Sequence, residues 1–146
     1  MKEITKKLLI RSGWNEGRCI DTSPIRKRYE EIKLEYQEIV DDFLREFGDL
    51  IIIPRDEKFF DISFNVINAI GCNIDAEYFK DCLSEYSVNE EVYPIGMACR
   101  NNLLVLMTKT TKFYCFTDGL LLYLGDSVSE MFDCVVDECR EAKEID

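Results

Sequence analysis

The chain has 146 residues, of which 47% are hydrophobic and 12% aromatic, and its formal net charge at pH 7 is −11. This length and composition predict one globular domain with a buried core and exclude a disordered chain. The longest apolar runs, Leu103–Met107 and Leu120–Leu124, are far shorter than the ~20 residues of a membrane span. Because the N-terminus also has no apolar stretch long enough for a signal peptide, we expect a cytoplasmic protein that does not contact membranes.

The negative charge is concentrated in the C-terminal part of the chain. Residues 1–60 contain 13 acidic and 12 basic residues, a net charge of −1, whereas residues 61–146 contain 16 and 6, a net charge of −10. A surface of this kind repels nucleic acid and attracts a basic partner. We therefore expect a protein partner and no nucleic-acid ligand.

The first twenty residues predict a short helix, a turn and a short strand. Residues 2–11 have the pattern of an amphipathic helix, with Ile4 and Leu8 facing the core. Gly13 ends this helix, and Arg18–Asp21 is expected to be a strand.

A single long helix is expected next. Ser23 is a good N-cap residue, Pro24 fits the first helical position, and Gly48 stops the helix as a C-terminal cap residue. Apolar residues recur between them at spacings of three and four, which predicts a core-facing stripe over six turns. The stripe comprises Ile25, Tyr29, Ile32, Tyr36, Ile39, Val40, Phe43, Leu44 and Phe47.

The remainder of the chain is predicted to be mostly β-structure. We expect a helix over residues 75–86, a hairpin turn at Asp118-Gly119, and a last helix that opens with a capping box from Ser127 to Glu130. The expected strands are Leu50–Ile53, Phe59–Phe64, Val92–Cys99, Leu103–Met107, Phe113–Phe116 and Leu120–Leu124. The inner face of the last helix comprises Val128, Phe132, Val135, Cys139 and Ala142. This order predicts an α+β fold over residues 1–146, with a largely antiparallel sheet and helices at both ends of the chain.

The sequence lacks the usual signs of catalysis. It contains no histidine, no Cys-x-x-Cys pair and no glycine-rich phosphate loop, so we expect no catalytic residue, no cofactor and no metal. A pair of carboxylates could still support glycoside hydrolysis, but nothing in the pattern singles out two of the 29 acidic residues. The seven cysteines are expected to be free thiols in a reducing compartment. They are Cys19, Cys72, Cys82, Cys99, Cys115, Cys134 and Cys139.

Two groups of acidic residues are candidates for partner binding. In the last expected helix, acidic residues recur at spacings of three and four and form one ridge, although like charges at i, i+4 and acids near a helix C-terminus reduce stability. Such broken local rules indicate a function, with plain solubility as the alternative. The ridge begins at Glu130, which also caps the helix, and continues with the binding candidates Asp133, Asp137, Glu141 and Glu144. The second group is Asp75, Glu77, Asp81, Glu90 and Glu91.

The ridge is expected to face solvent. Phe132, Val135 and Cys139 occupy the inner side of the same helix. Lysine in place of Asp133, Asp137 and Glu141 should therefore leave the fold intact.

The order of several short motifs resembles the third branch of the SUKH superfamily, a group of bacterial toxin-immunity proteins related to a fungal cell-wall regulator. The motifs run over nearly the whole chain. They are Ser12-Gly13-Trp14 followed by Gly17-Arg18, Phe43-Leu44-Arg45-Glu46-Phe47-Gly48, Tyr93-Pro94-Ile95-Gly96, Tyr114 through Gly119, and Leu124-Gly125-Asp126. The group often has a second glycine after Gly48, where this chain has Asp49.

The resemblance implies structural roles for the motif residues. Trp14 would pack the first helix and turn against the core, with its indole N–H on a backbone carbonyl, and Arg18 would be held by a carboxylate or a helix end. Alternatively, Trp14 between flexible glycines would be a binding platform. The structural signature carried over from the group comprises Trp14, Gly17, Arg18, Phe43, Phe47, Gly48, Pro94 and Gly96.

The resemblance also implies a function. The protein would be an immunity protein that binds and neutralises a cognate, basic protein toxin, such as a nuclease, through its acidic surface. It would act as a monomer or weak dimer and would not be an enzyme. The alternative is a non-catalytic scaffold or regulatory module of the fungal type.

Overall fold

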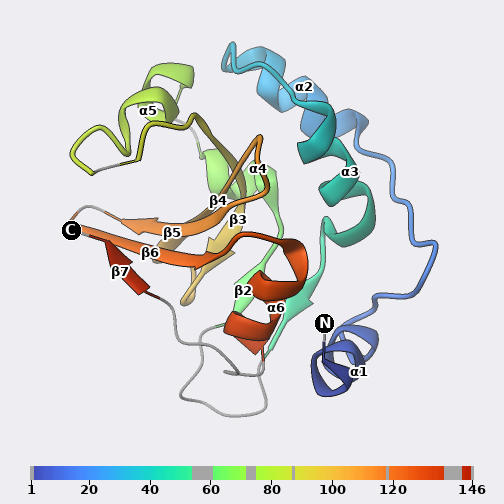
Figure 1. Ribbon diagram of the computed structural model, residues 1–146. Coiled ribbons are helices and arrows are strands. Elements are labelled where there is room, and N and C mark those ends of the chain that lie inside the picture. The colour runs from blue at the N-terminus through green and yellow to red at the C-terminus, as the bar shows by residue number, and fades with distance from the viewer. Residues whose placement is uncertain are drawn as a thin grey trace.

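A computed structural model describes residues 2–53, 61–71, 75–86, 88–117, 119–136 and 143–145 of the chain (Figure 1). The helices are α1 (Glu3–Arg11), α2 (Ser23–Glu31), α3 (Glu38–Phe47), α4 (Val66–Ile70), α5 (Ala76–Asp81) and α6 (Val128–Val136). The strands are β1 (Ile51–Ile52), β2 (Ile62–Ser63), β3 (Val92–Ala98), β4 (Leu103–Thr108), β5 (Phe113–Thr117), β6 (Leu120–Gly125) and β7 (Lys143–Ile145). None of the helices among these residues is long and apolar enough to cross a membrane.

The strands form one antiparallel sheet in the order of the sequence, from β1 at one edge to β7 at the other. Helices α4 and α5 lie between β2 and β3 in the chain, and α6 packs on β6. Figure 1 shows α1, α2 and α3 on one side of the view and α5 with the turns after it on the other. The predicted α+β class with a largely antiparallel sheet is confirmed.

The core joins α3 to the sheet and to α6 through a cluster of phenylalanines. Phe43 lies at the centre of this cluster, with its ring centroid 5.3 Å from that of Phe64 on one side and 5.5 Å from that of Phe113 on the other. Phe47, one turn later, lies 4.8 Å from Phe132 of α6. All five rings are buried. The apolar stripe of α3 therefore holds the two ends of the chain on the same core.

The predicted six-turn helix is wrong, because the chain forms two helices, α2 and α3, separated by an extended stretch. Lys33 adopts a left-handed conformation (φ 61°), and its N–H bonds to the Glu30 carbonyl. The N–H of Leu34 bonds to the carbonyl of Tyr29. This pair of bonds is a Schellman motif, which usually has glycine at the left-handed position. Because the sequence has lysine and not glycine at this position, it lacks the usual signal for the end of a helix.

A buried carboxylate ties these two helices together. Asp41 of α3 accepts hydrogen bonds from the Thr22 hydroxyl before α2 (2.5 Å) and from the Tyr36 hydroxyl in the connection (2.8 Å). Arg45 of α3 completes the arrangement with its Nε 2.6 Å from Asp41. Burial alone would raise the pKa of Asp41, but the hydrogen bonds and the Arg45 charge together lower it below its ordinary value. Asp41 is therefore a charged structural group.

Gly48 is the C-cap of α3, as predicted, but for a different reason. Its φ is −56°, which any residue can adopt. A Cβ at this position would lie 2.4 Å from the Leu44 carbonyl oxygen, so only glycine fits the close approach. The left-handed conformation falls on the next residue, Asp49 (φ 65°), where the resembling group often has its second glycine. Aspartate tolerates this conformation better than most residues do.

Several other expectations need correction. Arg18–Asp21 is irregular chain rather than a strand, and the N–H of Ile20 donates a hydrogen bond to the Arg45 carbonyl (2.9 Å). In α1 the predicted inward residue Ile4 is 36% exposed, whereas Thr5 is buried. Helix α4 was not expected from the sequence, and the helix expected over residues 75–86 ends at Asp81.

Strands β3 to β6 lie where they were predicted, with ends that differ by one residue at most, whereas β7 was not predicted. At the start of the last helix, the N–H of Glu130 bonds to the Ser127 hydroxyl (3.1 Å), as predicted for a capping box. The Glu130 carboxylate accepts from the N–H of Asp126 (2.7 Å), one residue before the expected Ser127. The turn at Gly119 has a positive φ of 86° and joins the paired strands β5 and β6. Parts of earlier predictions lie outside the described residues, namely Phe59, Phe60, Cys72, Asp118, Cys139 and Ala142.

Candidate protein-binding surface

Trp14 is part of the packing between α1 and α3. Its side chain is 7% exposed and its ring is stacked near that of Phe47, with centroids 6.3 Å apart. The indole N–H donates to the Glu46 carboxylate at 3.1 Å, rather than to the backbone carbonyl that was predicted. The Arg18 guanidinium donates to the Glu46 carbonyl at the end of α3 (2.7 Å), as predicted. Little of the ring is left for a ligand to stack on.

Pro94 and Gly96 also have structural roles in β3. The Pro94 carbonyl accepts the buried hydroxyl of Tyr29 at 2.7 Å, and burial raises the pKa of that hydroxyl well above its ordinary value, so it remains a neutral donor. A Cβ on Gly96 would lie 2.3 Å from the carbonyl oxygen of Ser63, so glycine lets β2 approach β3. These contacts give both motif residues a structural role, which joins β3 to α2 and to β2.

The acidic ridge predicted on the last helix does not form one helical surface. Asp133 of α6 is half-buried and accepts hydrogen bonds from the Thr5 hydroxyl (2.9 Å) and the backbone N–H of Lys2 (3.2 Å), so it docks α1 and does not face solvent freely. Glu144 is exposed, but it lies in β7, which pairs with β6. The ridge fails because the chain returns to the sheet at residue 143. Asp137 and Glu141 lie outside the described residues.

The second predicted group belongs to one short stretch, residues 75–91, which we call the acidic segment. It contains six acidic residues and only one basic residue, Lys80. The segment includes α5 and the turns after it, and it leads into β3. Its acidic residues are Asp75, Glu77, Asp81, Glu85, Glu90 and Glu91, of which all but Glu90 are exposed.

Three of these carboxylates have local partners. Asp75 caps α5 by accepting the N–H of Tyr78 at 3.2 Å, and Glu90 lies 3.5 Å from the ammonium of Lys112. Glu91 accepts the hydroxyl of Tyr93 at 3.1 Å. The other three, Glu77, Asp81 and Glu85, have no hydrogen bond or ion pair to another described side chain. The segment therefore exposes carboxylates that no other described side chain binds.

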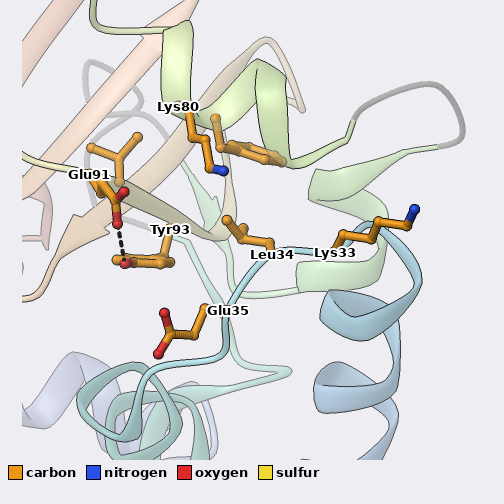
Figure 2. Close-up of a pocket in the computed structure, with 8 residues that line it drawn as sticks. Lys33, Leu34, Glu35, Lys80, Glu91 and Tyr93 are labelled. Atoms are coloured by element: carbon orange, nitrogen blue, oxygen red, sulfur yellow. Dashed lines mark hydrogen bonds between the residues drawn. The ribbon is translucent and has the colours of Figure 1, made fainter.

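A small cavity opens beside Glu91, where the α2–α3 connection, α5 and the start of β3 meet. Its volume is about 160 Å³. Figure 2 shows the Lys80 side chain reaching toward it from α5, while Lys33 points away. Burial and the bond to Glu91 raise the pKa of Tyr93 to about 12, so its hydroxyl is neutral at physiological pH. The cavity is lined by Lys33, Leu34, Glu35, Phe79, Lys80, Glu91, Val92 and Tyr93. The lining carries charges of both signs, from Lys80 on α5 and from Glu35 and Glu91.

Two of the described thiols, Cys82 and Cys115, are poor nucleophiles. Burial raises the pKa of Cys82 to about 11 and raises that of Cys115 further. Both thiols are therefore protonated at neutral pH, whereas nucleophilic attack and metal binding need the thiolate. Within the described ranges, no three Cys, Asp or Glu side chains are grouped as metal ligands. The chemistry of the surface is that of exposed carboxylates and aromatic rings.

Comparison with known proteins identifies the family. The family model for the SUKH-3 immunity protein matches residues 1–138. No curated protein and no solved structure matches the chain. The matched range includes α1, the acidic segment, the antiparallel strands up to β6 and α6.

Proposed function

Because the chain belongs to the SUKH-3 immunity protein family, we propose that it binds a cognate protein toxin and neutralises it in the cytoplasm of the cell that makes it. Family membership is the observation that carries this proposal. The proposed neutralisation is by binding alone; the Cys82 and Cys115 thiols, whose pKa values are raised by burial, stay protonated at neutral pH.

The acidic segment is the proposed contact surface. Its carboxylates Glu77, Asp81 and Glu85, which are exposed and have no partner among the described side chains, attract a basic face on the toxin. A toxin that cleaves nucleic acid needs such a basic face to bind phosphates, so an acidic surface can cover its active site. The net charge of −11 extends the attraction to distances set by the salt concentration. Glu144 on β7, together with Asp137 and Glu141, remains a secondary candidate for contact.

Co-expression with the cognate toxin tests the function. We expect growth to be restored only when the immunity protein is present, and we expect the purified proteins to form a complex. The association rate should fall as salt is added, because opposite charges steer the encounter. A toxin that remains active and shows no binding to the purified protein would contradict the proposal.

A further inference from the structure

We propose that a groove beside α5 receives a lysine or arginine side chain of the toxin. This inference rests on the proposed function and specifies which part of the acidic segment makes the central contact. The groove lies between α5 with its following turns and the β5–β6 hairpin, and its volume is about 420 Å³. It is lined by Tyr78, Asp81, Cys82, Ser84, Glu85, Tyr86, Phe116 and Gly119.

The groove and the cavity of Figure 2 use different sides of α5. Phe79 and Lys80 line the cavity, whereas Tyr78, Asp81 and Cys82 line the groove. At 100° per residue these two sets point in nearly opposite directions around the helix. The one basic residue of the acidic segment is therefore on the side away from the groove.

Aromatic rings form the apolar part of the groove. Phe116 of β5 is buried, and the ring of Tyr86 meets it edge-on, with centroids 6.4 Å apart and an interplanar angle of 88°. Tyr78 is half-buried on α5. Rings in this arrangement can pack against the methylene stem of a long side chain and attract a cationic head over a ring face.

The charged part of the groove is negative. Asp81 and Glu85 are both exposed, and within the described ranges neither forms an ion pair. Burial raises the pKa of Cys82 between them to about 11, so this thiol stays neutral. An anion would be repelled by the two carboxylates, and an apolar side chain would remove them from water without a partner. The methylene stem of a lysine or arginine side chain can pack against the rings, and its positive charge can pair with the carboxylates.

The groove is accessible to a side chain that projects from another protein. Ser84, Glu85 and Gly119 along it are exposed to solvent, and Glu77 lies on the same short helix. A buried cation between aromatic rings is a typical central contact of a protein interface, and exposed charges around it mainly accelerate association. The arrangement thus separates a central contact, formed by the groove, from a steering role for the rest of the segment.

The first test uses small probes that need no toxin. N-acetyl-arginine amide is compared with N-acetyl-citrulline amide, which has nearly the same shape without the charge, by NMR titration of the full chain. We expect saturable shifts of the Tyr86 and Phe116 ring signals with the arginine probe, and binding of the citrulline probe about tenfold weaker or less. Equal shifts with both probes, or none with either, would overturn the cation site.

A matched pair of variants completes this test. Asp81→Asn with Glu85→Gln removes two charges from the groove and should abolish the shifts. Glu30→Gln with Asp42→Asn removes two exposed charges from α2 and α3, which lie on the other side of Figure 1, and should leave the shifts unchanged. Equal losses in both variants would assign the binding to overall charge and not to the groove.

The second test uses the cognate toxin. The groove variant should raise the Kd for the toxin about tenfold or more, whereas the control variant should change it by less than about twofold. Unchanged melting temperatures would show that both variants are folded. If the wild-type protein binds the toxin and the groove variant binds it equally well, the groove inference fails and the proposed function stands. If the wild-type protein does not bind at all, the proposed function fails.

Discussion

Carboxylates have opposite roles in two regions of this molecule. Around α1 and α3, Asp41, Glu46 and Asp133 each accept hydrogen bonds from side chains or backbone of other elements. In the acidic segment, Glu77, Asp81 and Glu85 are exposed and have no partner among the described side chains. A large net charge therefore does not reveal which acids are available to a partner. The hydrogen bonds that each carboxylate forms show whether it is available.

The largest effect is expected at the tryptophan that packs α1 and the following turn on α3. Trp14→Ala removes a buried ring and the bond to Glu46, and should lower the free energy of unfolding by about 3–5 kcal/mol. Trp14→Phe keeps an aromatic ring next to Phe47 and should be milder. Urea unfolding followed by circular dichroism measures both. An alanine variant of normal stability that no longer binds the toxin would instead make Trp14 a binding platform.

The next effect is expected at Asp41. Asp41→Asn removes a charge that the Thr22 and Tyr36 hydroxyls and Arg45 stabilise, and should cost about 1–3 kcal/mol at pH 7. The folded-state pKa of Asp41 is lower than its unfolded value, so this stability is present above the unfolded pKa and is lost as pH falls through the folded pKa.

Unfolding at a series of pH values tests that sign. The difference between wild type and Asp41→Asn should be constant near neutral pH and shrink on acidification below about pH 4, the ordinary range of aspartate. Asp42→Asn, an exposed neighbour on the same helix, is the control and should follow the wild type. A difference that grows toward low pH would contradict the stabilised charge at Asp41.

The sequence predicted the two regions unequally, for physical reasons. Alternation and turn residues are local signals, so the strands from β3 to β6 and the capping box of α6 were found. The end of α2 was missed because Lys33 adopts the left-handed conformation that usually indicates glycine. Asp133 was misplaced because its partner Thr5 is 128 residues away in the chain.

The candidate site was likewise predicted only in part. The excess of acids in residues 75–91 is visible in the sequence, and five of the six were named as candidates. The groove was not predicted, because two of its lining residues, Phe116 and Gly119, belong to a hairpin that is distant from α5 in the sequence. Local composition gives the charge of a surface, and tertiary structure alone gives its shape.

A smaller stability effect is expected at Asp133. The sequence alone predicts that lysine in place of Asp133 leaves the fold intact. In the structure, however, Asp133 accepts hydrogen bonds from Thr5 and Lys2. Asp133→Ala should therefore lower the free energy of unfolding by about 1–2 kcal/mol and weaken the docking of α1 on α6. Hydrogen exchange should show faster exchange in Glu3–Arg11 than in the wild type. Unchanged protection of this helix would contradict the docking role of Asp133.

The smallest stability effect is expected in the acidic segment. Neutralising Glu77, Asp81 and Glu85 together, as Gln, Asn and Gln, should change the free energy of unfolding by less than about 0.5 kcal/mol, since no described side chain loses a hydrogen bond or ion pair. Removing like charges four residues apart could even stabilise the segment slightly. Stopped-flow mixing with the toxin should nevertheless show slower association and a flatter dependence on salt. A loss of more than about 1 kcal/mol with unchanged association would place these carboxylates with the structural ones, and the distinction between the two regions would fail.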